Sequence, residues 1–159
     1  MGELDFENVV FGYGGNALFN DFSASFAKEQ ISCIVGPNGC GKSTLAKLAM
    51  GLIKPASGRV RIQGRDVASL NPRERARRLG VLVQQQEAPM MTVRELAACG
   101  RFPHHGPLSR LDETDAQCID ETLSLAGVYD LRDRPLRSLS GGQRQRARMA
   151  MVLAQDTPV

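Results

Sequence analysis

Apolar and polar residues alternate at the start of the chain. Leu4 and Phe6 alternate with Asp5 and Glu7, and the segment FSASF, residues 22–26, repeats this spacing after the turn-rich stretch GYGGN. An apolar residue at every second position is typical of a strand with one buried face. The pattern therefore predicts two antiparallel, half-buried strands joined by a turn.

Two later segments are almost continuously apolar. ISCIV, residues 31–35, and LGVLVQ, residues 79–84, lack the alternation of the opening strands. Short runs of this kind are typical of strands that are buried on both faces of an α/β sheet. Between them, the sequence predicts a short strand in GRVRIQG, residues 58–64, and a helix in the arginine-rich stretch RERARR, residues 73–78.

Helical spacing follows in other parts of the chain. TVRE, residues 92–95, fits a capping box at a helix start. Another helix is predicted after LSGGQ, through RQRARMAMVLA, residues 144–154. The apolar residues at helical spacing are Leu45, Leu48, Ala49 and Leu52 in the first half, and Ala116, Ile119, Leu123 and Ala126 in the second.

Composition and charge narrow the class of protein. The 159 residues are 42% hydrophobic and 23% charged, as in ordinary soluble globular domains. A formal net charge of +3, and Glu74 within the RERARR stretch, favour a solvated helix face over a nucleic-acid patch, so we expect no nucleic-acid partner. No stretch reaches the ~20 apolar residues that span a bilayer, and the start lacks the features of a signal peptide. We expect a cytoplasmic chain whose four cysteines, which form no CxxC pair, are reduced.

The stretch GPNGCGKSTL, residues 36–45, joins the first apolar run to a helical pattern and satisfies the pattern GxxxxGK[ST]. Glycines let backbone N–H groups approach a phosphate closely, and a helix N-terminus favours negative charge. We expect the loop amides to surround the β-phosphate, Lys42 to bridge the β- and γ-phosphates, and Ser43 to bind Mg²⁺. The predicted nucleotide-binding residues here are Gly36, Asn38, Gly39, Cys40, Gly41, Lys42, Ser43 and Thr44.

A second glycine-containing helix start lies in LSGGQRQR, residues 139–146. Ser140 is suited to cap the helix, and Gly141 and Gly142 would expose N–H groups at its N-terminus. Taken alone, such a start is typical of a turn and a cap. With the phosphate loop upstream, it predicts a second anion site at Ser140, Gly141, Gly142 and Gln143.

At these residues the chain resembles the ATP-binding cassette (ABC) family of ATPases, whose signature sequence is LSGGQ. The resemblance extends in order over essentially the whole chain. It implies an α/β fold with a P-loop NTPase (RecA-like) core, an antiparallel β subdomain and an α-helical insert. We therefore expect the β subdomain and nucleotide-binding core over 1–87, the helical subdomain over 88–137, and the signature motif with a helix returning to the core over 138–159.

The resemblance implies roles for two further residues. Tyr13 matches the family's aromatic residue that stacks on adenine, and Gln84 matches the glutamine that contacts Mg²⁺ and the attacking water. Gln85 and Gln86 follow, so the register is not unique; Gln84 is chosen because it directly ends the apolar run. The resemblance thus implies ATP and Mg²⁺ as cofactors, Lys42 and Gln84 as catalytic residues, and Ser43 and Gln84 as metal ligands.

The family also implies partners. Two of its domains pair head to tail around ATP, so we expect ATP-dependent pairing with a second copy of the chain. The family's helical insert grips a membrane permease, which would place the chain on the cytoplasmic face of the inner (plasma) membrane. GRFPHH, residues 100–105, is a finer likeness to the ATPases of bacterial importers of iron siderophores, haem and cobalamin. His104 and His105 lack further ligands nearby and do not predict a metal site.

One part of the family pattern is absent from the 159 residues. The family's catalytic acids lie on an apolar run that ends in Asp-Glu, shortly after the signature helix, and no such run is found. The sequence therefore predicts a fold truncated before this Walker B strand, part of a longer ATPase, with negligible ATP hydrolysis by these residues alone. Two alternatives remain: a soluble, non-transport ABC ATPase and a non-hydrolysing nucleotide-binding module.

Overall fold

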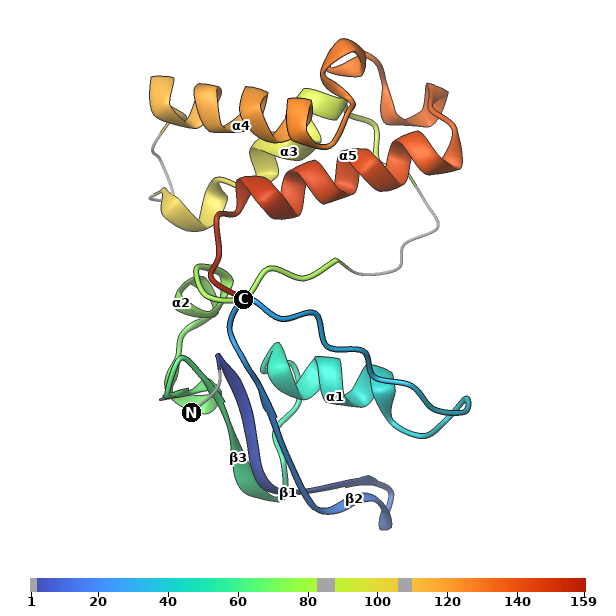
Figure 1. Ribbon diagram of the computed structural model, residues 1–159, viewed down its shortest axis with the longest axis vertical. Helices are drawn as coiled ribbons and strands as arrows, with labels where there is room; N and C mark the ends of the chain where they lie inside the picture. Colours follow the sequence, from blue (N-terminus) through green and yellow to red (C-terminus); the bar gives the residue numbers. More distant parts are fainter. Residues whose placement is uncertain (1–2, 83–87, 106–109) are drawn as a thin grey trace. The chain divides into compact units, whose positions relative to one another are not determined.

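Two compact units make up the structure, a computed structural model that describes residues 3–82, 88–105 and 110–159 (Figure 1). The first unit comprises Met1–Leu79 with Pro158–Val159, and the second comprises Gly80–Thr157. Each unit has its own hydrophobic core. The phosphate loop belongs to the first unit and the LSGGQ stretch to the second.

A four-stranded antiparallel sheet forms most of the first unit. Its strands are β1 (Leu4–Tyr13), β2 (Asn16–Phe26), β3 (Ser57–Ile62) and β4 (Arg65–Asp66), in the order β2-β1-β3-β4. The helices of this unit are α1 (Lys42–Ala49), the 3₁₀ turn η1 (Val67–Ser69) and α2 (Pro72–Ala76). The two alternating segments at the start of the chain are thus confirmed as antiparallel strands, and GRVRIQG is confirmed as a strand and turn.

The β1–β2 hairpin turns on two glycines. Tyr13 pairs with Asn16, and Gly14 and Gly15 between them have φ values of 57° and 86°. Two successive positive φ values are those of a type I′ turn, which matches the twist of the flanking strands. The glycine pair therefore places Tyr13 at the end of β1, directly beside the turn.

Helix α1 packs against the sheet through one continuous core. Its buried residues Leu45, Leu48 and Ala49 lie among apolar side chains of β1 and β3. The other buried members of this core are Phe6, Val9, Phe11, Val60, Ile62 and Val67. Because this face of α1 is buried, the sheet determines the position of the helix start.

The prediction of two strands buried on both faces is wrong for the described residues. Ile31 and Val35 are 103% and 85% exposed, and residues 30–37 and 79–82 have no strand pairing. A strand of this type needs hydrogen-bonded neighbours and a layer on each face. The four described strands form the antiparallel sheet, which neither segment joins.

The second unit is helical. Its elements are α3 (Val93–Cys99), η2 (Phe102–His104), α4 (Glu113–Leu125), η3 (Tyr129–Leu131), η4 (Leu136–Ser138) and α5 (Gly141–Ala154). Helices α3, α4 and α5 share one core, which includes Leu96, Ile119, Leu123, Ala147 and Ala150. Each of the three begins with a capping box, and the box predicted at Thr92 and Glu95 is confirmed.

A buried ion-pair network joins these helices. Asp115, at the start of α4, accepts a hydrogen bond from Arg101 Nε at 2.8 Å, and its other carboxylate oxygen lies 2.7 Å from His105 Nε2. The Asp115 side chain is only 3% exposed. Arg101 also donates to the Ala154 carbonyl at the end of α5. Burial disfavours the charged carboxylate, but the Asp112 N–H, the Arg101 guanidinium and His105 hold the pKa of Asp115 well below its ordinary value.

We predict that Asp115→Asn destabilises the helical unit. The substitution removes the charge that Arg101 and His105 face, so it should lower the free energy of unfolding by about 2–3 kcal/mol. Urea denaturation followed by far-UV circular dichroism measures the change. Asp120→Asn is the matched control, because Asp120 and its partner Arg94 are each 37% exposed, and such pairs contribute less than about 1 kcal/mol.

The cost of Asp115→Asn should depend on pH. The pKa of Asp115 is lower in the folded chain than in the unfolded chain, where it is about 3.9. The stabilisation by its charge is therefore complete above about pH 4 and is lost as the pH falls further. The difference in the free energy of unfolding between wild type and Asp115→Asn should therefore become smaller below about pH 4. A difference that stays constant down to acid unfolding would contradict a stabilising charge.

Candidate functional site

The phosphate loop begins helix α1 with glycines in left-handed conformations. Gly41 is the N-cap residue of α1 with a φ of 98°, and Gly39 has a φ of 84°. Only glycine adopts such values without strain. The loop can therefore turn sharply into α1 while its backbone remains open to a ligand.

The side chain of Lys42, the first residue of α1, folds back against the loop that precedes the helix. Its Nζ donates to the carbonyls of Gly36 and Pro37, at 2.7 Å each, and lies 3.7 Å from the sulfur of Cys40. The structure thus places the ammonium of Lys42, which the sequence predicts to contact phosphate, beside the first residues of the loop. The side chain is half-buried, so its charge stays close to the loop.

The first turn of α1 has backbone N–H groups without a partner in the helix, and its next residues are held by packing in the core. The first N–H groups of an α-helix have no partner within the helix. Ser43 is exposed, whereas Thr44 is only 8% exposed and Leu45 is buried in the core. The helix start therefore offers backbone N–H groups and a hydroxyl on a support that is fixed by packing.

Tyr13 offers a partly exposed aromatic ring in the same unit. The ring is 52% exposed and packs edge-on against Phe11, with ring centroids 4.9 Å apart and planes at 87°. Such T-shaped contacts fix the orientation of a ring. Gln84, the other residue expected from the resemblance, lies outside the described residues.

The LSGGQ stretch begins α5 with a capping box. Ser140 Oγ accepts from the Gln143 N–H at 3.3 Å, and the Ser140 N–H donates to Gln143 Oε1 at 2.9 Å. A Cβ at Gly141 or Gly142 would meet no atom within 4 Å, and neither residue has a positive φ. Packing and backbone conformation in the described chain therefore give no reason for glycine here, although glycine costs about 1 kcal/mol relative to alanine inside a helix.

Leu18 and Phe19 are residues at the site that the sequence did not indicate. The Phe19 ring and the Leu18 side chain lie against Gly41, closer than a Cβ at that position would permit. The alternating pattern of β2 gave no sign of this contact, because a register shift in the strand changes which side chains face α1.

The adjacent histidines serve the fold of the second unit. His104 Nε2 lies 2.8 Å from the Gln155 carbonyl, and His105 contacts Asp115. No cluster of three metal-ligating side chains occurs in residues 3–82, 88–105 and 110–159. Each imidazole thus has a protein partner that accounts for its position.

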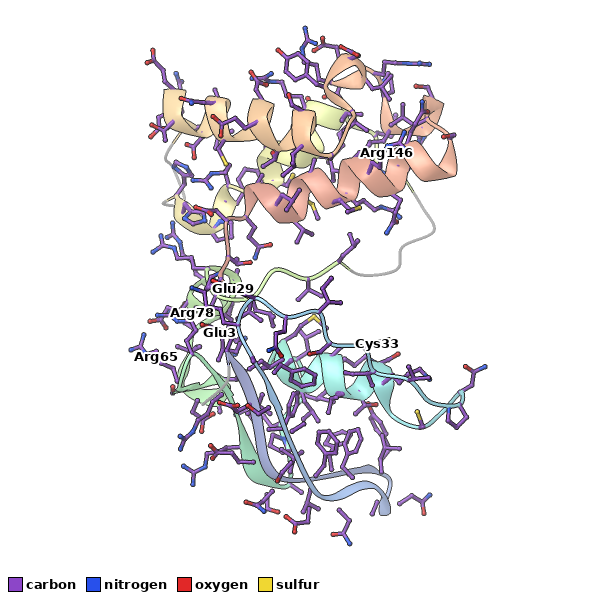
Figure 2. The ribbon with its side chains drawn as sticks, viewed as in Figure 1. Glu3, Glu29, Cys33, Arg65, Arg78 and Arg146 are labelled. Atoms are coloured by element: carbon purple, nitrogen blue, oxygen red, sulfur yellow. The ribbon has the colours of Figure 1, made fainter. Side chains whose placement is uncertain are left out.

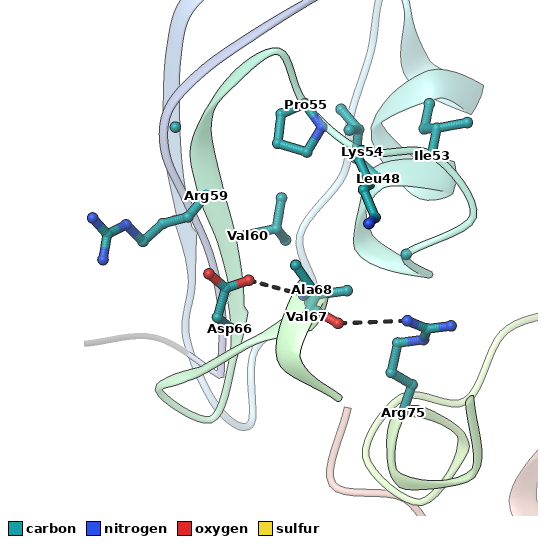
Figure 3. A pocket seen from close by; sticks show the side chains of 12 residues that line it. Leu48, Ile53, Lys54, Pro55, Arg59, Val60, Asp66, Val67, Ala68 and Arg75 are labelled. Carbon is teal, nitrogen blue, oxygen red and sulfur yellow. Dashed lines mark hydrogen bonds between the residues drawn. The ribbon is translucent and has the colours of Figure 1, made fainter. Parts of the chain in front are cut away.

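A cavity of about 190 Å³ lies elsewhere in the first unit, between the end of α1 and strand β3 (Figure 3). Its polar groups hold the fold together. Asp66 accepts from the Ala68 N–H at 2.8 Å, and Arg75 donates to the Val67 and Leu70 carbonyls. These contacts occupy the side chains of Asp66 and Arg75. The cavity is therefore a weaker candidate than the phosphate loop.

Comparison with known proteins relates the chain to one family. A family model described as ABC transporter matches residues 19–159. The chain is 38% identical to the iron(3+)-hydroxamate import ATP-binding protein FhuC of Bacillus subtilis, over 99% of this chain and 59% of that protein. It is also 38% identical to the ferric enterobactin transport ATP-binding protein FepC of Escherichia coli, over 96% of this chain and 57% of that protein. The chain therefore spans less than two thirds of the length of these relatives.

A solved structure supports the fold class. An ATP-binding cassette of an ABC transporter, 28% identical in sequence, superposes with a TM-score of 0.84 over 99% of this chain and 66% of that chain. The predicted α/β class, a P-loop NTPase fold with an antiparallel sheet and a helical part, is confirmed by this likeness.

We predict that alkylation of Cys40 reports ligand binding to the loop. Cys40 is exposed, and its sulfur lies 3.7 Å from Lys42 Nζ and 2.7 Å from the position that a Cβ on Gly36 would take. N-ethylmaleimide should modify Cys40, and MgATP should slow the reaction because a bound phosphate would cover the loop. Peptide mass spectrometry measures the rate, with Cys33, on the extended segment before the loop, as internal reference (Figure 2). Equal slowing at both cysteines, or none at Cys40, would contradict the prediction.

Proposed function

Because the chain belongs to the ABC transporter family, we propose that it is the ATP-binding part of an importer ATPase. The complete protein would couple ATP binding and hydrolysis to uptake of an iron-siderophore, haem or cobalamin through a membrane permease. The names of the relatives, which describe import of iron hydroxamate and transport of ferric enterobactin, favour an iron chelate. The chain spans 57–59% of these relatives, so activity, cargo and partners are part of the proposal.

The geometry of the phosphate loop carries this proposal. Lys42 Nζ and the first-turn N–H groups of α1 lie on one loop that left-handed Gly41 turns into the helix. Together they supply an ammonium and several fixed donors for a polyphosphate. The backbone of residues 36–44 would hold the phosphates, and Tyr13 would stack on adenine.

The residues also fit Mg²⁺ together with ATP. An exposed serine hydroxyl beside a phosphate-binding loop is a suitable oxygen ligand for this hard cation. Ser43 would hold the ion, with Gln84 as the second protein ligand by its place in the sequence. Bound ATP supplies the phosphoric anhydride whose cleavage drives transport, while Lys42 would hold its terminal phosphates in place.

The signature stretch is proposed to contact ATP bound to a second copy. Gly141 and Gly142 are exposed and have no packing reason to be glycine, which favours close approach by a group from outside the chain. Ser140 Oγ already accepts from Gln143, so its own proton remains available to a phosphate oxygen. Gln143 keeps Ser140 in this orientation. Head-to-tail pairing would then depend on ATP.

Hydrolysis needs groups that the 159 residues do not supply. No apolar run in the sequence ends in the Asp-Glu pair that would orient Mg²⁺ and polarise water. We therefore expect these residues alone to bind MgATP without measurable turnover. ATP hydrolysis by the purified 159-residue chain that Ser140→Ala abolishes would contradict this expectation.

The helical unit would bind the permease on the cytoplasmic face of the membrane. Within the described part of the chain, no helix has the length and apolar character to cross a bilayer. The alternative, a soluble ABC ATPase, would act without a permease. Co-purification of the protein with an integral membrane protein favours the importer, and a soluble complex lacking one favours the alternative.

We predict that Lys42→Ala abolishes most MgATP binding. Loss of the charged donor should weaken affinity by about 10–100-fold, since each hydrogen bond to a charged group contributes about 1.5–3 kcal/mol. Lys47→Ala is the control, because Lys47 is an exposed lysine in the last turn of the same helix. Isothermal titration calorimetry on both variants decides the matter. Equal affinities for MgATP would remove Lys42 from the site.

A further inference from the structure

Two side chains of β2 lie against the bare face of Gly41. A Cβ built on Gly41 would be 2.7 Å from Phe19 Cζ and 3.2 Å from Leu18 Cδ2. Contacts below 3.0 Å are sterically forbidden to real Cβ atoms. The sheet and the phosphate loop therefore approach each other as closely as a glycine allows.

A β-bulge brings both side chains to this contact. Phe11 pairs with Phe19, but the next pair is Gly12 with Ala17, so Leu18 is an extra residue in β2. A bulge interrupts the alternation of side chains and re-aims those beside it. Leu18 and Phe19, although adjacent in sequence, can therefore both reach Gly41.

Glycine in the opposite strand makes this bulge possible. A Cβ on Gly12 would lie 2.2 Å from the carbonyl oxygen of Asn16. Any larger residue would push the strands apart where the register shifts. The sequence thus contains two glycines, Gly12 and Gly41, whose common effect is close packing of β1, β2 and the loop.

We propose that Phe19, assisted by Leu18, is a positioning residue for the phosphate loop. Its ring supports Gly41 from the side of the sheet and keeps the left-handed turn that directs the first N–H groups of α1. This support concerns the loop itself; its effect on nucleotide affinity rests on the proposed function.

The same strands hold the predicted adenine platform. Phe11 pairs across the sheet with Phe19, and its ring lies 4.9 Å from the ring of Tyr13. Phe11, which contacts Tyr13, and Phe19, which contacts Gly41, are therefore opposite each other in the register of one hairpin. A rigid connection of this kind would keep the base-binding and phosphate-binding parts of the site at a constant spacing.

Phe22 provides a matched control. It lies on the same strand, is half-buried in the same core, and its ring centroid is 5.3 Å from that of Phe19. The atoms nearest to a Cβ on Gly41 in the described chain belong to Phe19 and Leu18. Phe22→Ala therefore removes an equal apolar group from the core without removing the support of the loop.

The first test needs no nucleotide. The rate of Cys40 alkylation by N-ethylmaleimide, divided by that of Cys33, is measured for wild type, Phe19→Ala and Phe22→Ala. We expect Phe19→Ala to raise this ratio several-fold, because the loop loses its support, and Phe22→Ala to leave it near the wild-type value. Equal ratios in the two variants would overturn the proposal.

The second test measures MgATP affinity of the same three proteins at a temperature where all are folded. Phe19→Ala should weaken binding by about tenfold, and Phe22→Ala by less than about twofold. If wild type binds no MgATP but its Cys40 ratio still responds to Phe19→Ala, the proposed function fails and the support of the loop stands. If both variants weaken binding equally, the proposal fails and nucleotide binding stands.

A milder pair of variants covers loss of folding. If Phe19→Ala is not folded, Phe19→Leu is compared with Phe22→Leu. Leucine keeps an apolar group in the core but lacks the Cζ atom that lies against Gly41. The same difference in the alkylation ratio is expected, at a smaller size, and its absence would overturn the proposal.

Discussion

The left-handed backbone of Gly41 is the constraint on which the phosphate loop depends. With its φ of 98°, Gly41 is the last residue of the turn over residues 38–41 and the N-cap of α1, whose first N–H groups have no partner within the helix. A side chain at this position would be strained and would also collide with Phe19. The conformation, the packing of β2 and the position of Lys42 are therefore parts of one arrangement.

In the second unit, the helix start at Ser140 is held in position by side-chain hydrogen bonds instead of a left-handed glycine. The capping box is reciprocal, and the helices of this unit are tied together by the buried Asp115 with Arg101 and His105. Removal of one partner from a buried ion pair leaves an uncompensated charge, so each of the three side chains depends on the others. The glycines of the signature stretch remain exposed on this firm support, in line with contact to a group outside the chain.

Features that depend on neighbouring residues could be predicted from the sequence. The capping box of Thr92 and Glu95 and the glycine turn into α1 depend only on short spacings. The contact of Phe19 with Gly41 could not be predicted, because it arises from a one-residue shift between two strands. The run at 31–35 was predicted as a strand from its composition, but strand formation depends on partners distant in sequence, which local patterns do not contain.

Amide NMR spectra of the isotopically labelled chain, recorded during titration with MgATP, would show directly whether the phosphate loop binds the nucleotide. We expect saturable shifts concentrated in residues 36–44 and at Tyr13, with little change in the residues around Asp66. Saturable shifts that leave the loop unchanged, or no binding by the folded chain, would contradict this expectation.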